Sequence, residues 1–373
     1  MLTLYKIAIE PSAQSRHLYF IFIMLMMILI SCGTDQKLQR AAFMADESSA
    51  SIKYSIICFI HGDGDYNYHD TDGKKYSADE VVLAKIQKIA VQNPSAEIFV
   101  FHQKPREHFL FFFPLKDGEF YYYRNGQLIH NELYWRDYEK SNFDNEINYY
   151  RLFHVKNRDH IMNLVFYFGH EIPEIGGAGY DVSYAERTFT INDFAEGLSN
   201  FKKDFEKFDL IMLSTCYGGT PFTISAIAPL TKYIIASPEN LHLSYFDLDV
   251  WEQMDSNSNN ENIHAFAKSF AKLAFDRLTK DIHTTISVAV YDAERVKEYI
   301  NSVERLYKNT LTTLRGETAT HPQNIERCDC AEIPEYKLSN MNEGIEIFYR
   351  PAKFGKLKNK KNHSGWQCWK LIE

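Results

Sequence analysis

The sequence predicts an α/β fold, in which a mostly parallel sheet carries helices on both faces. Several short segments are continuous apolar runs rich in β-branched and aromatic residues, which is typical of strands buried on both sides. Amphipathic segments alternate with these runs, as expected when helices connect parallel strands. Of the 373 residues, 45% are hydrophobic and 15% aromatic, which is ample for a packed core and excludes a disordered chain.

The predicted elements follow one another between residues 54 and 307. Strands are expected at Tyr54–His61, Ala96–His102, Met162–Phe168, Phe208–Ser214, Tyr233–Ser237 and Thr284–Val290. Helices are expected at Ala78–Val91, Tyr149–Asn157, Ile191–Phe205, Glu261–Leu278 and Ala293–Tyr307. Thr190 or Asn192 is expected to cap the third helix, and Asn260 the fourth. A hairpin is expected between Phe109–Pro114 and Glu119–Arg124.

The chain is expected to divide into four regions. From the N-terminus these are a signal peptide, a polar tether, the main α/β domain and a small appendage, at residues 1–31, 32–51, 52–317 and 318–373. The appendage consists of loops and two predicted short strands, Ile345–Tyr349 and Trp366–Ile372.

The N-terminal apolar run is too short for a typical membrane span. Residues 18–31 form 14 nearly unbroken apolar positions, whereas a spanning helix needs about 20, so the run fits the core of a signal peptide. It ends in Leu29-Ile30-Ser31-Cys32, which resembles the lipobox of bacterial lipoproteins. The resemblance implies cleavage before Cys32, a lipid on that cysteine and a lipid-anchored protein of the bacterial cell envelope. An uncleaved anchor helix is the alternative.

Charge and cysteine content exclude further classes of protein. The 41 basic and 49 acidic side chains give a net charge of −8, and only the short Lys353–Lys361 segment concentrates positive charge, which disfavours a nucleic-acid partner. The six cysteines do not show the paired spacing of a structural zinc site. Cys58 lies in a predicted strand and is expected in the core, whereas Cys328, Cys330 and Cys368 could be bridged or free.

Two strand ends carry residues suited to nucleophilic catalysis. In parallel sheets, functional groups collect at the carboxyl ends of the strands. The third predicted strand is followed by Gly169-His170-Glu171, and the fourth by Thr215-Cys216-Tyr217. A thiol becomes a strong nucleophile when it ionises, and a nearby imidazole favours the thiolate and protonates the leaving group.

These residues resemble the clostripain-like cysteine peptidases of the caspase-like clan. In that family an apolar strand ends in His, a helix follows, and the next apolar strand ends in the nucleophilic Cys. Here His170 and Cys216 are 46 residues apart, close to the spacing of about 50 in caspases. The order of the predicted elements over roughly residues 52–310 also matches. The resemblance implies a caspase-like fold and a cysteine endopeptidase that acts on protein or peptide substrates without a cofactor.

The resemblance also implies residue roles. Cys216 falls on the nucleophile and His170 on the catalytic histidine, while the backbone N–H groups of Cys216 and Glu171 would stabilise the oxyanion. Glu171 departs from the glycine usual after the histidine. Ser214 stands where the family usually has an Asp that recognises a basic P1 residue, so Glu239 or Asp247 would have to supply that charge. Activation by cleavage between the two strands would have Arg187 as a candidate site.

Two other readings stay open. One is a catalytically inactive relative that acts as a surface or periplasmic binding module. The other is a metal-dependent hydrolase built on His61, Asp63, Asp65 and His170, although these do not form a recognisable ligand set. The loop after His61 begins like a calcium site, but Tyr68 and Lys74 occupy the positions that require Gly and Glu. No metal or other cofactor is therefore expected, and a Ca²⁺ requirement has no recognisable loop to support it.

Overall fold

The computed structural model describes fifteen stretches of the chain. They are residues 52–62, 67–69, 72–110, 112–136, 143–154, 161–174, 189–202, 205–239, 241, 248, 251–252, 254, 262–298, 300–301 and 344–359. All belong to one compact unit, Ala50–Glu373. The predicted signal peptide and tether with Cys32, and also Arg187, Asp247 and the three C-terminal cysteines, lie outside the described residues.

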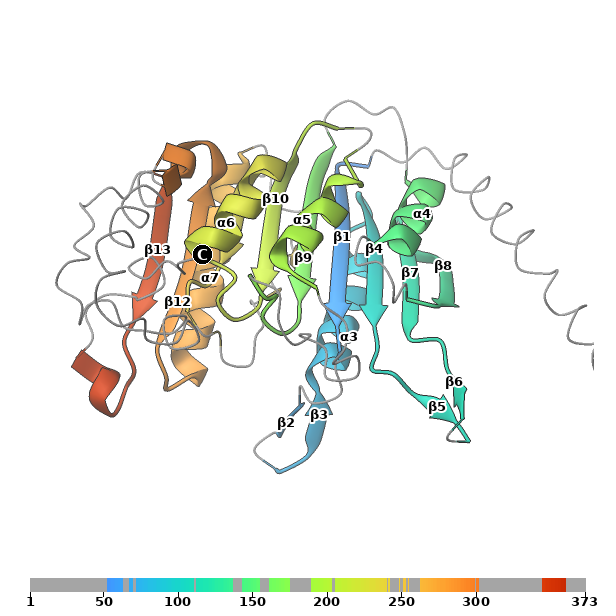
Figure 1. Cartoon of the computed structure of the whole chain (residues 1–373), viewed down its shortest axis with the longest axis horizontal. Helices are drawn as coiled ribbons and strands as arrows, with labels where there is room; N and C mark the ends of the chain where they lie inside the picture. The colour runs from blue at the N-terminus through green and yellow to red at the C-terminus, as the bar shows by residue number, and fades with distance from the viewer. Residues whose placement is uncertain are drawn as a thin grey trace, which may run out of the picture. The chain divides into compact units, whose positions relative to one another are not determined.

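A nine-stranded sheet forms the centre of this unit (Figure 1). In spatial order its strands are β13 (Ile345–Arg350), β12 (Ile286–Asp292), β11 (Thr231–Ala236), β10 (Phe208–Ser214), β9 (Met162–Phe168), β1 (Tyr54–His61), β4 (Ala96–Gln103), β7 (Gly118–Arg124) and β8 (Gln127–Tyr134). The five strands from β11 to β4 are parallel, and antiparallel pairs complete both sides. The predicted mostly parallel α/β sheet is confirmed.

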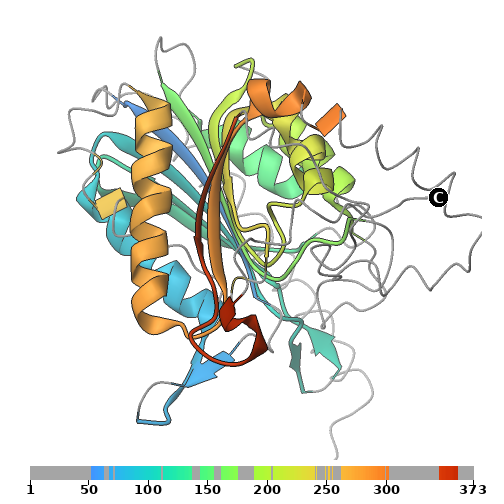
Figure 2. The same cartoon turned by 90° about the vertical axis from the view of Figure 1, so that its left-hand side faces the viewer.

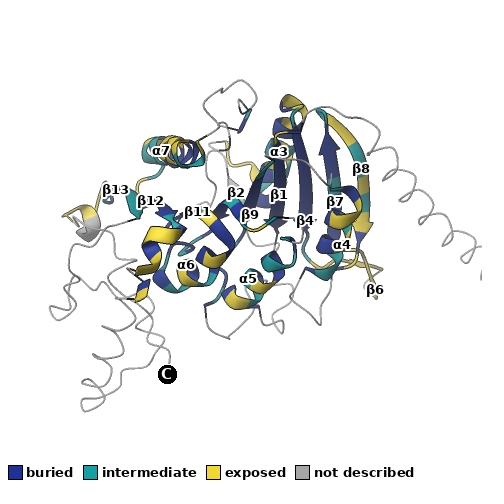
Figure 3. Ribbon diagram, turned by 90° about the horizontal axis from the view of Figure 1, so that it is seen from above, coloured by how far each residue is buried: buried dark blue, intermediate teal, exposed yellow. Residues whose placement is uncertain are grey.

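Helices cover both faces of the sheet (Figure 2; Figure 3). One face carries α3 (Ala78–Gln92) and α7 (Ile263–Asp281), and the other carries α4 (Asp144–Phe153), α5 (Ile191–Ser199) and α6 (Pro221–Ile227). Because both faces are covered, all eight residues of β1 and of β4 are buried, which explains their continuous apolar runs.

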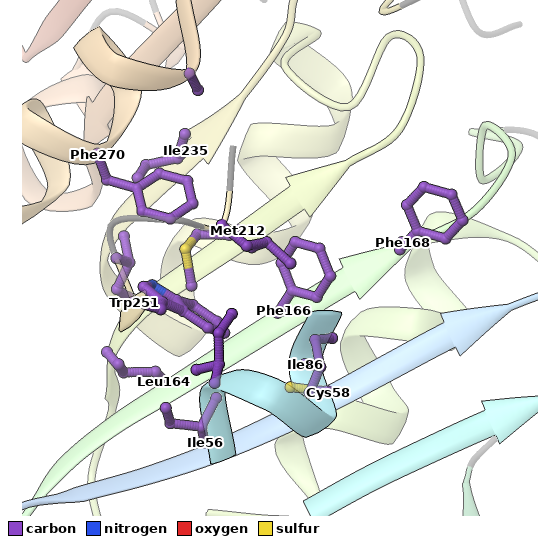
Figure 4. Close-up of a cluster of buried hydrophobic side chains, with 14 of the residues drawn as sticks. Ile56, Cys58, Ile86, Leu164, Phe166, Phe168, Met212, Ile235, Trp251 and Phe270 are labelled. Atoms are coloured by element: carbon purple, nitrogen blue, oxygen red, sulfur yellow. The ribbon is translucent and has the colours of Figure 1, made fainter. Parts of the chain in front are cut away.

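The two faces pack differently. On the α3 and α7 side, Cys58 of β1 and Ile86 join a mixed aliphatic and aromatic cluster that includes Trp251 (Figure 4). On the other side Phe59 packs against Phe143, with ring centroids 4.5 Å apart, in a largely aromatic layer. Consecutive residues of β1, such as Cys58 and Phe59, therefore pack into the cores on opposite faces of the sheet, because side chains alternate between the two faces along a strand.

The predicted hairpin between Phe109–Pro114 and Glu119–Arg124 is wrong. The short strands β5 (His108–Phe109) and β6 (Phe113–Pro114) pair with each other instead. The second segment, β7, pairs with β4 and β8. The turn to β8 is Asn125-Gly126, in which both residues have positive φ, as the type I′ turns of two-residue hairpins require. This Asn-Gly pair was the stronger hairpin signal in the sequence.

Several predicted helix ends also differ from the structure. Thr190 caps α5 through a reciprocal capping box with Asp193, but the helix ends at Ser199 rather than Phe205. Asn262, not Asn260, caps α7. Helix α4 begins at Asp144, five residues before the predicted start. The pair β2 (Asn67–His69) and β3 (Lys75–Ser77) was not predicted.

The C-terminal described segment continues the main sheet. Strand β13 contains the predicted strand Ile345–Tyr349 and lies antiparallel to β12. Two short 3-10 helices are η2 (Ala228–Leu230) and η6 (Lys356–Asn359). Residues 293–298 and 300–301 are helical and belong to the predicted helix Ala293–Tyr307, whose other residues lie outside the described part of the chain. Among the described residues, no helix is both long and apolar enough to cross a membrane.

Candidate active site

The register of two neighbouring strands brings the predicted catalytic residues to the same edge. Strands β9 and β10 are parallel, and Phe168 pairs with Ser214, the last residue of each strand. His170 and Cys216 each follow their strand end by two residues. Adjacent strands are about 4.8 Å apart, so equal extension beyond paired residues puts both residues at the same carboxyl edge of the sheet, on the loops that follow two neighbouring strands.

The chain after β9 is fixed by backbone contacts. The Gly169 N–H donates to the Ser214 carbonyl at 3.4 Å and thus extends the strand pairing by one residue. The Tyr167 hydroxyl donates to the His170 carbonyl at 3.4 Å. A Cβ at Gly169 would lie 2.8 Å from that hydroxyl and 2.9 Å from the Cβ of His61, so only glycine fits here. His170 itself is half-buried.

The loop that follows β10 holds Cys216 at a bend. Cys216 is half-buried, and its Sγ lies 3.9 Å from the Leu241 carbonyl oxygen. The next residue, Tyr217, has φ +52°, a left-handed conformation that costs a non-glycine residue about 1 kcal/mol. Its N–H donates to the Glu239 carbonyl at 3.1 Å, and the Gly219 N–H donates to Ser237 at 2.8 Å. The strained bend is therefore held against the segment after β11.

A side-chain pair connects the two loops. The Thr220 hydroxyl, which follows Cys216 by four residues, donates to the carboxylate of the buried Glu174, which follows His170 by four residues. Thr220 also caps α6 by accepting from the Thr223 N–H at 3.3 Å. Sequence reasoning missed Thr220 and Glu174, although Thr220-Pro221 is a recognisable helix-start signal.

The two described cysteines differ in their exposure. Cys58 is completely buried, and burial raises its pKa far above the ordinary value, so it stays a thiol in the core as predicted. Cys216 is half-buried at a strand end. Of the two cysteines that the structure describes, only Cys216 keeps part of its surface exposed.

The other predicted site residues lie in different environments. Ser214 is fully buried beneath the site, and Glu171 is half-buried. Glu239 is 6% exposed, and its backbone contacts Tyr217 directly. Of the residues named for a metal hydrolase, His61 is buried at the end of β1, while Asp63 and Asp65 lie outside the described residues. Within the described part of the chain, no three side chains form a cluster suited to a metal ion.

A further histidine at this edge, on β4, was not singled out from the sequence. His102 is buried, with Nε2 2.7 Å from Asp79 Oδ2 and Nδ1 3.1 Å from Glu119 Oε2. Burial alone would lower the pKa of His102, but these hydrogen bonds outweigh burial and raise it. In turn, the hydrogen bond from His102 lowers the pKa of Glu119 to about 2. The cluster is a charged brace between α3, β4 and β7.

Comparison with known proteins identifies the family. The sequence model of the clostripain family, peptidase family C11, matches residues 167–356, half of the chain, including both His170 and Cys216. The chain belongs to the clostripain family. The predicted class of enzyme, a clostripain-like cysteine peptidase with protein or peptide substrates, is thereby confirmed. The nine-stranded sheet between two helical layers is the caspase-like arrangement that the resemblance implied.

Solved structures of C11 proteases are similar to this clostripain-family chain. A secreted C11 cysteine protease from Bacteroides thetaiotaomicron, bound to an irreversible peptide inhibitor, is 12% identical over 70% of this chain and 71% of its own, with a TM-score of 0.49. Iotapain, a secreted C11 protease from the same organism, is 11% identical over 74% of each chain, with a TM-score of 0.48. An inactive zymogen C11 protease from Parabacteroides distasonis is 13% identical over 76% and 71%, with a TM-score of 0.45. No curated protein sequence matches the chain.

Proposed function

We propose that this cysteine peptidase is an endopeptidase that works through a Cys216–His170 dyad. The observation that carries the proposal is the register of β9 and β10, in which both residues extend equally beyond the paired Phe168 and Ser214. The buried Cys58, by contrast, offers a thiol without access to substrate. The hydrogen bond from the Thr220 hydroxyl to the Glu174 carboxylate, here called the clasp, joins the loops that follow β9 and β10 and supports a fixed position of one loop against the other.

The chemistry of the dyad follows from its groups. The Cys216 thiolate attacks the carbonyl carbon of the scissile peptide bond, and the backbone N–H groups of Cys216 and Glu171 stabilise the oxyanion that forms. The C–N bond then breaks, and protonated His170 gives its proton to the leaving amine. Water, deprotonated by His170, attacks the resulting thioester, releases the carboxylic acid and restores the thiol.

We propose Glu239 as the carboxylate that selects a basic P1 residue. Ser214 carries no charge, so it does not provide a charge-assisted contact. Glu239 accepts a backbone hydrogen bond from Tyr217 and therefore lies beside the residue that follows the nucleophile. If this assignment holds, Glu239→Gln lowers cleavage after Arg and Lys much more than cleavage after neutral residues. Asp247→Asn is the matched control, and a change of P1 preference in that variant instead would assign the role to Asp247.

The experiment that tests the dyad is digestion of a mixed peptide library, before and after limited proteolysis of the enzyme. Cleavage by the wild type that disappears in Cys216→Ala, and persists in the matched control Cys58→Ala, supports the dyad. Iodoacetamide should alkylate Cys216 much faster than Cys58, because burial keeps Cys58 protonated. A folded protein without cleavage under either condition would favour the inactive binding module, and inhibition by chelators but not by iodoacetamide would favour the metal hydrolase.

We also propose that the enzyme is a lipid-anchored protein of the bacterial cell envelope. The support is the apolar run at residues 18–31 followed by the lipobox-like Leu29-Ile30-Ser31-Cys32. Mass spectrometry of the N-terminal peptide from membranes of an expressing bacterium should find it beginning at lipid-modified Cys32. A peptide that retains residues 1–31 would instead indicate an uncleaved anchor, and Cys32→Ser supplies the matched unmodified control.

A further inference from the structure

The loop between β4 and β7 carries an unusual concentration of exposed apolar side chains. Phe112 is 81% exposed, and Phe109, Leu110, Phe113 and Leu115 are also exposed. Turn positions normally carry Gly, Asn, Asp or Ser, whereas this hairpin turns through Leu and Phe. Exposed apolar side chains that gather in one place mark an interaction surface.

The loop is built to project these side chains from a fixed base. The Lys104 N–H donates to the Asp117 carbonyl at 2.7 Å, and β5 and β6 pair above this closure. The buried Arg136 fixes the base, because its backbone N–H donates to Asp117 Oδ1 at 3.1 Å and its guanidinium donates to the Lys104 carbonyl at 3.4 Å. These hydrogen bonds hold the base of the β5–β6 hairpin against the main sheet, while its tip projects beyond it.

Exposed apolar side chains are not confined to one face of the hairpin, which discriminates between possible occupants. Phe109 and Phe113 pair directly across the strands and share one face. The opposite face carries the other cross-strand pair, His108 and Pro114, and Leu110 and Phe112 are the next described residues toward the turn. A flat partner surface, including that of a second copy of the chain, would cover one face and leave the other in water. A lipid interface surrounds a projecting tip on all sides.

Two basic residues next to the apolar tip favour a membrane surface. Arg106 and Lys116 flank the apolar run in sequence, with the acidic Glu107 beside Arg106, and can attract anionic lipid headgroups. Lys104 lies further from the tip, and its Nζ donates to Glu119 Oε1 at 3.1 Å. Trp135, which directly precedes the anchoring Arg136, is 42% exposed, and tryptophan is enriched where membrane meets water. We infer that the β5–β6 hairpin inserts its apolar tip into the interface of an anionic lipid membrane.

Insertion has a consequence for the enzyme. The hairpin follows the carboxyl end of β4, and β9 and β10 end at the same edge of the sheet (Figure 1). A membrane-inserted tip would turn the Cys216 edge toward the lipid surface. Substrate cleavage would then be directed to polypeptides near the membrane, whether or not Cys32 carries a lipid.

A tryptophan probe at the tip tests insertion independently of the N-terminal apolar run. The full chain carrying Phe112→Trp is mixed with vesicles of phosphatidylcholine and phosphatidylglycerol, and the wild-type spectrum is subtracted to remove the four native tryptophans. The added emission should shift to shorter wavelength, be quenched by brominated acyl chains and become protected from iodide. Val91→Trp is the matched control, because Val91 is 58% exposed at the opposite edge, where α3 ends, and should stay accessible to iodide.

Graded variants sharpen the same measurement. In a Phe109→Trp background, Phe112→Asp should raise the lipid concentration for half-maximal quenching by about 10- to 100-fold, the effect of losing one inserted aromatic side chain. Arg106→Gln and Lys116→Gln should each raise it about fivefold on anionic vesicles only. The inference is overturned if Phe112→Trp stays accessible to iodide in the presence of vesicles. It is equally overturned if the emission shifts without vesicles while sedimentation reports a dimer, because the occupant is then a second copy.

Discussion

Two histidines at the carboxyl edge of one sheet have opposite surroundings. His102, in β4, is buried with both ring nitrogens bonded to carboxylates, and its charged form is stabilised. His170, two residues beyond β9, is half-buried on a loop that backbone hydrogen bonds position. The comparison teaches that a strand-end position alone does not mark a catalytic residue. A histidine whose two ring nitrogens contact carboxylates braces the fold, whereas a half-buried histidine on a loop keeps the exposed surface that the proposed proton transfer to a substrate requires.

The largest expected effect is the loss of peptidase activity when Cys216 or His170 is replaced. Cys216→Ala and His170→Ala should each lower kcat/KM by at least about 10³-fold, and the double variant should be little worse, because the two groups act as a unit. The melting temperature should change little, since both side chains are only half-buried. Steady-state kinetics and thermal unfolding of the three variants measure both. Losses that multiply in the double variant would contradict a dyad.

The second expected effect is a loss of stability when the cluster of His102, Asp79 and Glu119 is broken. His102→Leu removes the partner of a buried carboxylate at Asp79 and should lower the free energy of unfolding by about 3–5 kcal/mol. The matched control is His264→Leu, because His264 contacts Glu346 at 3.0 Å but is 44% exposed, so its loss should cost less than about 1 kcal/mol. Urea unfolding compares the two. Equal effects would mean that His102 is not a brace.

The pH dependence of the same brace has a defined sign. The pKa of His102 is raised on folding, so its contribution is complete below its ordinary value of 6.5 and is lost as pH rises through the raised value. The pKa of Glu119 is lowered from 4.5 to about 2, so its contribution is complete above 4.5 and is lost as pH falls toward 2. The difference in unfolding free energy between wild type and His102→Leu should therefore be largest between about pH 4.5 and 6.5. A difference independent of pH would contradict the charged state of His102.

Local patterns in the sequence predicted the sheet better than the loops. The strand Tyr54–His61 was predictable because its burial on both faces demands a continuous apolar run, and the cap at Thr190 because its partner Asp193 is three residues away. The segment Phe109–Pro114 was misassigned because it is apolar without being buried. Apolar composition normally indicates the core, and here it indicates a projecting tip.

The candidate site divides in the same way. His170 and Cys216 were predictable because each follows a recognisable strand, and their catalytic roles stay a prediction. The contacts that support them were not predictable, because they join residues distant in sequence. Glu174 meets Thr220 across 46 positions, and Asp79 meets His102 across 23, so only the packed sheet brings them together. The burial of Ser214 likewise depends on which chain segments cover the strand end.

The smallest expected effect concerns the contacts that hold the His170 and Cys216 loops together. Unlike the cluster around His102, which is held by charged side chains, these loops are held mainly by backbone hydrogen bonds and by the hydrogen bond between Thr220 and Glu174. Thr220→Val removes the clasp and the cap of α6, and should lower the free energy of unfolding by about 1–2 kcal/mol. Because the clasp joins the loops that carry His170 and Cys216, kcat should fall more than this loss of stability alone explains. Thr220→Ser keeps the hydroxyl and should behave as wild type in thermal unfolding and in peptide cleavage. If Thr220→Val loses stability but keeps full kcat, the clasp serves only the fold, and the backbone bonds alone position the site.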